Sequence, residues 1–171
     1  MALNNLALST LRHIQIAVEA RDRAAPYRTF FDNFYAYYRG GPLLNDAGRP
    51  YWFNNPCPRK HRNALASLHF VSSAASRVLA GLDTERLVRD HAIPVAVLRE
   101  ILMNAHPPSD EVVERYLRSF YRLGLITESE DERLSAAGLR SHMPKSWHSH
   151  DGAFARYEAV AITAHQVRDE L

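Results

Sequence analysis

Apolar residues recur along most of the chain at the spacing of an amphipathic helix, and breaker residues divide the pattern into segments. The first stripe comprises Leu3, Leu6, Leu11, Ile14 and Val18. A second helix is predicted over 27–39, because Pro26 favours a helix start and a glycine pair follows the segment. A third stripe predicts a long helix over 60–80, which Gly81 ends.

Helix signals continue through the second half of the chain. The further segments predicted to be helical are 84–89, 95–104, 110–123, 128–137 and 153–169. Ser109 can cap the helix that begins at 110, and Thr127 with Glu130 has the spacing of a capping box. The proline-rich loop at 42–59 is expected to contain at most a short hairpin near 43–53.

These segments predict a mainly α fold, a single compact helical domain over 1–171 with about seven helices. A soft boundary is expected in the loop 40–59. The chain has no run of about 18 apolar residues, so no membrane-spanning helix is expected. Its single cysteine, Cys57, and an N-terminus without a signal-peptide pattern indicate a cytoplasmic protein.

Charge is divided unevenly along the chain. Residues 1–80 carry an excess of six positive charges and residues 81–171 an excess of four negative charges, within a net charge of +2. This division predicts either an anionic partner or attraction between the two halves. The cluster of Arg59, Lys60 and Arg62 is the candidate contact for the phosphates of a nucleic acid.

Aromatic residues are concentrated in the segment 27–53, interleaved with arginines. Part of this set is predicted to line the core face of the helix over 27–39, and the rest to form a surface for a protein partner. Stacking on single-stranded nucleic acid is a further alternative. The candidate partner surface comprises Tyr35, Tyr37, Tyr38 and Trp52.

The sequence Asp90-His91-Ala92-Ile93-Pro94 resembles the opening of an HNH-type nuclease motif. The resemblance implies that His91 acts as general base on a water molecule and that Asp90 binds a divalent metal. It covers five residues, and the helix predicted after Pro94 departs from the ββα-metal element of that family. The alternative is a structural histidine that precedes a helix started by proline.

A second candidate metal site lies in the polar loop after residue 138. His148 and His150 alternate, so an extended backbone would place both imidazoles on one side, and His142 lies nearby. Such a set could hold Zn, Mn or Fe, and Asp90 or His91 could complete it. The alternative is a solvated loop in which Asp151 caps the following helix.

Residues 93–138 can also be interpreted as a winged helix whose recognition helix carries Arg115, Arg118 and Arg122 on one face. The capping box at Thr127 favours a helix where the wing would be. The sequence therefore predicts a nucleic-acid-directed protein, either a metal-dependent or a degenerate nuclease-like one, and leaves its enzymatic activity open. The alternatives are a non-catalytic helical interaction module and a winged-helix-like regulator.

Overall fold

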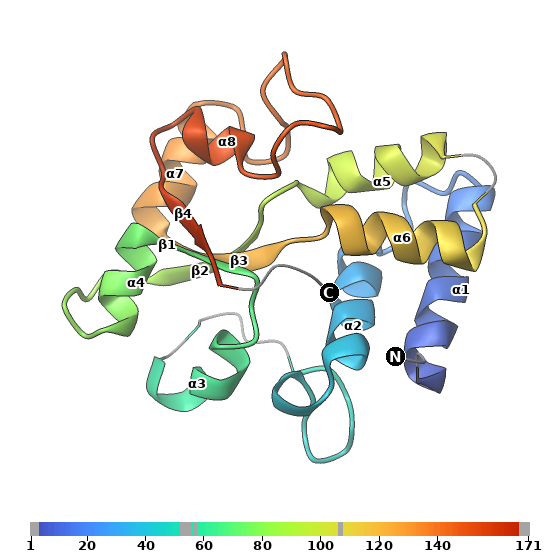
Figure 1. Cartoon of the computed structure of the whole chain (residues 1–171), viewed down its shortest axis with the longest axis horizontal. Coiled ribbons are helices and arrows are strands. Elements are labelled where there is room, and N and C mark those ends of the chain that lie inside the picture. The colour runs from blue at the N-terminus through green and yellow to red at the C-terminus, as the bar shows by residue number, and fades with distance from the viewer. Residues whose placement is uncertain (1–3, 52–55, 57, 106–107, 168–171) are drawn as a thin grey trace. The chain divides into compact units, whose positions relative to one another are not determined.

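A computed structural model describes residues 4–51, 56, 58–105 and 108–167, and the chain divides into two compact units. Residues 1–52 and 98–121 form the first unit, and residues 53–97 and 122–170 form the second. Within the described residues the chain has eight α-helices and four strands (Figure 1). Each unit is described by itself below. No helix in the described part of the chain is long and apolar enough to cross a membrane.

The first unit is helical. Its elements are α1 (Asn5–Glu19), α2 (Tyr27–Arg39), the short 3-10 helix η1 (Gly41–Leu43), most of α5 (Val95–Asn104) and α6 (Asp110–Phe120). The side chains of Asn4 and Ser109 accept hydrogen bonds from first-turn amides of α1 and α6, as helix N-caps do. The predicted bounds of α2 and α5 are confirmed. A single bridge between Leu44 and Pro50 makes a small hairpin in the loop after η1.

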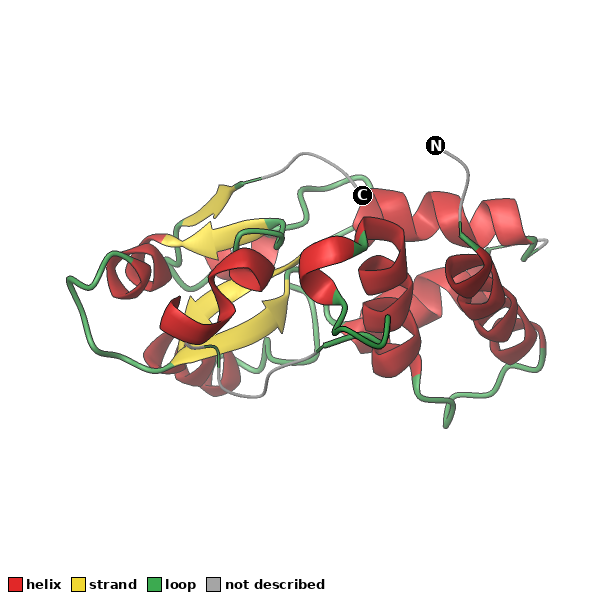
Figure 2. Cartoon of the chain, turned by 90° about the horizontal axis from the view of Figure 1, so that it is seen from below, coloured by secondary structure: helices red, strands yellow, loops and turns green. Residues whose placement is uncertain are grey.

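The second unit is built on a four-stranded mixed sheet in the order β2-β3-β1-β4 (Figure 2). The strands are β1 (Phe70–Ser72), β2 (Leu87–His91), β3 (Leu123–Thr127) and β4 (Ala164–Gln166). The β3 strand runs parallel to β1 and antiparallel to β2, and β4 pairs antiparallel with β1. Segments far apart in the sequence are therefore neighbours in this sheet.

Helices α3 (Pro58–Leu65), α4 (Ser73–Leu79), α7 (Glu128–Ala136) and α8 (Ala155–Glu158) complete the second unit. One face of the sheet packs on a buried apolar cluster that α7 and α8 share. The buried members of this cluster are Phe70, Ala92, Ile126, Leu134, Tyr157 and Ile162. Full burial of each large apolar side chain stabilises the fold by about 1.5–3 kcal/mol.

Gly124 allows β1 and β3 to approach closely. A Cβ atom at position 124 would lie 2.5 Å from Cδ1 of Phe70, its partner in the parallel ladder, and would also meet the Phe70 carbonyl oxygen. Real Cβ contacts of this length are essentially absent from proteins. This position therefore requires glycine for space.

A buried polar junction joins both parallel strands to the helices that follow them. The Ser72 hydroxyl donates to Glu130 Oε2 at 2.5 Å and accepts from the Ala75 amide at the start of α4. The Thr127 amide donates to the same Glu130 oxygen at 2.8 Å. The capping box predicted at Thr127 and Glu130 is confirmed, and its carboxylate also anchors β1.

The predicted mainly α fold is wrong, because a four-stranded sheet forms where helices were expected. The predicted helix over 60–80 is two helices with β1 between them, and the predicted helix over 84–89 is replaced by β2. The predicted helix over 153–169 shortens to α8 and is followed by β4. The cause is long-range pairing, since hydrogen bonds between strands outweigh weak local helix preference once partners meet.

Candidate functional site

The loop between α7 and α8 carries the densest group of metal-ligating side chains in the described part of the chain. Its backbone turns back on itself, since the Asp151 amide donates to the His148 carbonyl at 2.9 Å. The His148 amide donates in return to Asp151 Oδ2 at 2.6 Å. The indole of Trp147 donates to the Gly152 carbonyl at 3.2 Å, which closes the loop further. Asp151 therefore holds this turn and does not cap α8, whose N-cap is Phe154.

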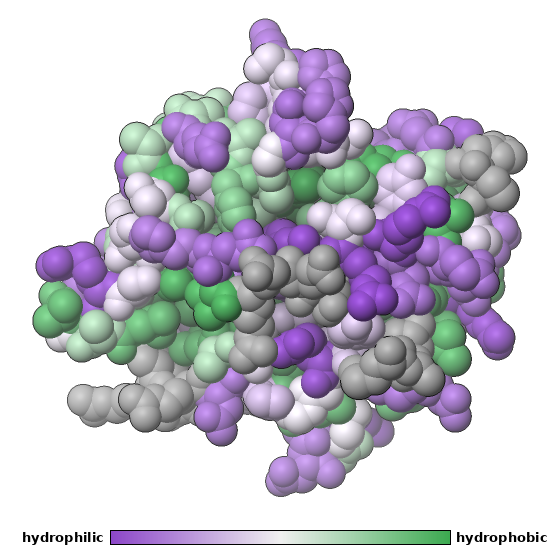
Figure 3. Space-filling view, in the orientation of Figure 1, coloured by the Kyte–Doolittle hydropathy of each residue, from purple (hydrophilic) through white to green (hydrophobic). Residues whose placement is uncertain are grey.

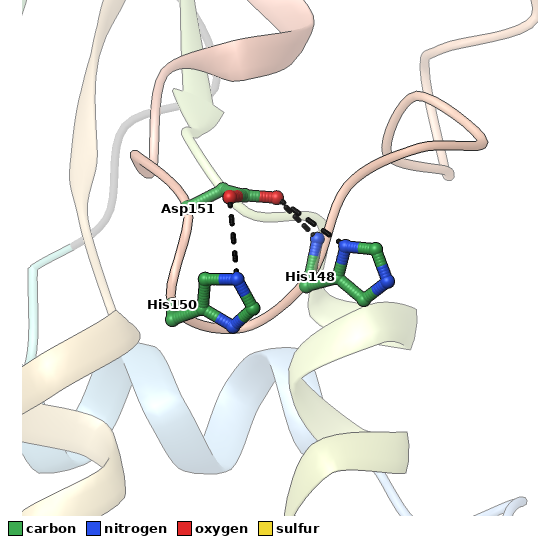
Figure 4. Close-up of side chains that lie close together, drawn as sticks. All are labelled: His148, His150 and Asp151. Carbon is green, nitrogen blue, oxygen red and sulfur yellow. Dashed lines mark hydrogen bonds and ion pairs between the residues drawn. The ribbon is translucent and has the colours of Figure 1, made fainter.

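This turn brings His148, His150 and Asp151 together (Figure 4). Asp151 Oδ2 lies 3.7 Å from His148 Nδ1, and Oδ1 lies 3.7 Å from His150 Nε2. The two imidazole rings stack, with centroids 5.4 Å apart. One ligand atom from each residue lies within 4.8 Å of the others. The side chains of His148 and His150 are 69% and 80% exposed, so an ion in solution can reach them.

The spacing of these atoms is close to that of a metal site. Zinc bonds of about 2.0–2.1 Å in tetrahedral geometry place neighbouring ligand atoms roughly 3.4 Å apart. The two contacts of 3.7 Å exceed that value by only a few tenths of an ångström. These two contacts go to different oxygens of Asp151, and the two imidazole rings are stacked, so both rings must turn before they can share one ion.

His142 lies outside this group, although the sequence analysis counted it among the metal ligands. Its Nδ1 lies 3.1 Å from the hydroxyl of Ser141, and both side chains are exposed. Asp90, which was expected to complete the site, is also outside the group within the described residues. The candidate ligand group is thus His148, His150 and Asp151, all from one short loop.

Asp90 and His91 end strand β2, where they pair with Gly124 and Leu123. Successive side chains of a strand point to opposite faces of the sheet. The Asp90 carboxylate faces α8, where it accepts hydrogen bonds from Arg156 and from the Tyr157 hydroxyl, the latter at 2.7 Å. His91 faces the other side and is 3% exposed. The HNH resemblance implied that both side chains act at one metal-bound water. In this structure they point to opposite faces of the sheet instead.

Arg156 is the centre of this buried network, and its side chain is 1% exposed. Its guanidinium pairs with Asp90 and packs over the ring of Tyr157 at 4.9 Å. It also donates to the backbone carbonyls of His91, Ala92, Leu139 and Arg140. Burial, followed by the nearby Asp90, raises the pKa of Tyr157 well above its ordinary value, so its hydroxyl stays protonated as a donor.

From the sequence Tyr157 belongs to the apolar stripe of the last predicted helix, and nothing marks Arg156. An arginine directly before a tyrosine on an apolar stripe is a weak signal, because Arg side chains are usually solvated. The Asp90 side chain of the HNH-like motif therefore has a structural partner that only the fold reveals.

The predicted arginine stripe is divided between the two units. Helix α6 ends at Phe120, so Arg122 lies beyond the helix that carries Arg115 and Arg118. Arg118 donates to Glu114 Oε1 at 3.3 Å and to the Tyr38 hydroxyl at 2.8 Å. Residues 128–136 are helical, so no returning wing strand follows β3. This geometry differs from the recognition helix and wing that the sequence suggested.

The predicted aromatic surface is partly core. Tyr35 is buried and its ring lies 5.4 Å from that of Tyr121, whose hydroxyl donates to the buried Asp32 at 2.7 Å. Tyr37 and Tyr38 are half-buried on α2. Trp52 lies outside the described residues.

The structure places Arg59, Lys60 and Arg62 on α3, but their side chains lie outside the described part of the chain. Their contact with phosphate stays a prediction. Comparison of the chain with known protein families, curated proteins and solved structures finds no match.

Proposed function

We propose that this protein binds one divalent transition-metal ion through His148, His150 and Asp151. The observation that carries the proposal is the approach of two imidazole nitrogens and a carboxylate oxygen within 4.8 Å on an exposed turn. Imidazole favours zinc, copper, iron and nickel, and the carboxylate neutralises part of the charge of the ion. The hydrogen bond from the His148 amide orients the carboxylate before an ion arrives.

Three protein ligands leave at least one coordination position for water, which is the arrangement of catalytic rather than structural zinc sites. A metal held by these three residues would supply a nucleophilic water near neutral pH, so the class of chemistry proposed is metal-assisted hydrolysis. A shallow pocket of about 380 Å³ adjoins the site, and Asp151, Trp147 and Glu158 contribute to its wall. A polar group of a substrate could lie there beside the ion, with the indole ring as an apolar platform.

Isothermal titration of the metal-free chain with Zn²⁺ tests this proposal. The expected result is one ion per chain, with binding abolished in the His148→Ala/His150→Ala double variant. His142→Ala is the matched control, because this exposed histidine of the same loop lies outside the ligand group. If His142→Ala loses as much zinc binding as the double variant, zinc binds nonspecifically to exposed histidines and the proposal is overturned.

A nucleic acid is the proposed substrate or partner, and the charge excess of residues 1–80 favours it. The three cations Arg59, Lys60 and Arg62 lie within α3, whose backbone is kinked at His61. A cytoplasmic location, where thiols stay reduced, accords with a single cysteine.

Electrophoretic shift on single- and double-stranded DNA at two salt concentrations tests this part of the proposal. Replacing the three cations by alanine should weaken binding to all sequences and reduce the salt slope by roughly three. Arg12→Ala is the control, since it removes an exposed arginine that lies 3.7 Å from Asp110. Binding that does not change with salt would contradict phosphate recognition.

A further inference from the structure

The face of the sheet opposite the apolar cluster of α7 and α8 holds an apolar pocket of about 240 Å³. All of its lining residues are apolar, and they include Val71 of β1, Leu125 of β3, Leu79 of α4 and Val167. Hydrophobic residues gather around α4 on the side of the molecule that Figure 3 shows. The volume is below the range of about 300–1,000 Å³ typical of drug-sized ligands, so a short chain fits it best.

The strand register places a histidine at the rim of this pocket. His165 of β4 lies directly opposite Val71 of β1, and directly paired residues of antiparallel strands point to the same face. Val167 follows two residues later, and its amide continues the ladder by donating to the His69 carbonyl at 2.7 Å. His165 does not line the pocket itself, but it shares a sheet face with Val71 and Val167, which do.

Ser73 is the hydrogen-bonding partner of this histidine. It is the first residue of α4, directly after β1, and its Oγ lies 2.7 Å from His165 Nε2. Both side chains are exposed. The preceding Ser72 is different, because its buried hydroxyl is held by Glu130 and the Ala75 amide. A serine hydroxyl within hydrogen-bond reach of an imidazole, near an apolar pocket, supplies the nucleophile and the base of nucleophilic acyl transfer.

We infer that Ser73 and His165 form a nucleophile and base pair that hydrolyses esters with a short apolar acyl chain, which the pocket holds. Ser73 Oγ attacks the ester carbonyl carbon while His165 Nε2 takes the hydroxyl proton. The tetrahedral intermediate expels the alcohol, which receives that proton from the imidazolium. Water then attacks the acyl-serine by the same proton route, and a carboxylic acid leaves while Ser73 regains its proton.

The expected rate is modest. Among the described residues, no acidic side chain hydrogen-bonds the other ring nitrogen of His165, so no third group orients the base. General base catalysis alone contributes roughly 10²–10⁴-fold. This activity is independent of the proposed metal site, whose ligands lie in the loop between α7 and α8.

The test uses the full chain after treatment with a chelator, with p-nitrophenyl butyrate as substrate. Ser73→Ala and His165→Gln should each lower kcat/KM by at least ~10²-fold. Ser76→Ala is the matched control, one turn further along α4, and should keep the parent rate. A fluorophosphonate probe should label Ser73 in peptide mapping of the parent protein. Circular dichroism should show that each variant is folded.

The pocket has its own test. Leu79→Gln replaces an apolar lining residue by a polar one and should raise KM roughly tenfold with kcat unchanged. A Ser73→Ala variant as active as the parent, or labelling at another serine, would overturn the inference. Activity that disappears with the chelator or in His148→Ala would assign hydrolysis to the metal site instead. A failure of zinc binding would leave the result of this test unchanged.

Discussion

Replacement of Arg156 by methionine is expected to destabilise the second unit strongly. Methionine fills a similar volume, but it leaves the Asp90 carboxylate without its cationic partner. It also removes the donors to the carbonyls of Ala92 and Leu139, which Arg156 reaches at 2.9 Å each. The remaining polar groups would then be buried without these partners.

The magnitude follows from the burial of the pair. Removing one partner of a buried ion pair costs about 3–5 kcal/mol, because the other charge stays behind uncompensated. The total free energy of unfolding of a domain is about 5–15 kcal/mol. Arg156→Met is therefore expected to remove a large part of the stability of the unit.

Urea denaturation followed by circular dichroism measures this loss. Arg140→Met is the control, since this exposed arginine pairs with Asp131 at the surface and should contribute about 0–1 kcal/mol. The double variant Asp90→Asn/Arg156→Met removes both charges. Its loss in free energy of unfolding should therefore be about 1–3 kcal/mol smaller than the sum of the losses in the two single variants. Equal midpoints for Arg156→Met and the control would refute a stabilising role for the pair.

Three further predictions concern single residues. Gly124→Ala should destabilise by about 1–3 kcal/mol, because its Cβ would overlap Phe70, and thermal denaturation measures the loss. An unchanged melting temperature would contradict the close strand approach. Thr127→Ala should destabilise by about 1 kcal/mol through loss of the N-cap, and coincident urea midpoints would contradict the cap. Hydrogen bonding and ion pairing with Arg23 help to lower the pKa of Glu100 in the folded protein to about 2. The ionised carboxylate therefore stabilises the fold at pH values above the pKa that Glu100 has in the unfolded chain, and this stabilisation is lost as the pH falls towards 2. Glu100→Gln should therefore reduce the difference in stability between pH 6 and pH 2, and an acid titration followed by circular dichroism that matches the parent would contradict this.

The metal-binding proposal rests on residues that a sequence can indicate only in part. The alternation of His148 and His150 predicted that their imidazoles lie together, and they do so on a tight turn instead of an extended segment. Asp151 was expected to cap a helix, but its carboxylate accepts from the His148 amide. The turn places the Asp151 carboxylate beside the two imidazoles and leaves His142 outside the group, because the path of the backbone determines which side chains come close together.

The sequence by itself determined the helices whose signals are local. The stripe of α1, the proline before α2, the Ser109 cap of α6 and the capping box of α7 all act within a few residues. The starts of α2, α6 and α7 could be predicted because a proline or a cap acts on the residues next to it.

Only the tertiary structure decided the sheet and the network at its centre. The short segment Phe70–Ser72 is a strand because residues around 124 and 165 lie beside it, and nothing near it in the sequence specifies those partners. Asp90 meets Arg156 across 66 residues of chain. Strand preference and the role of a charged side chain depend on what packs against them, so they emerge only when distant segments are brought together.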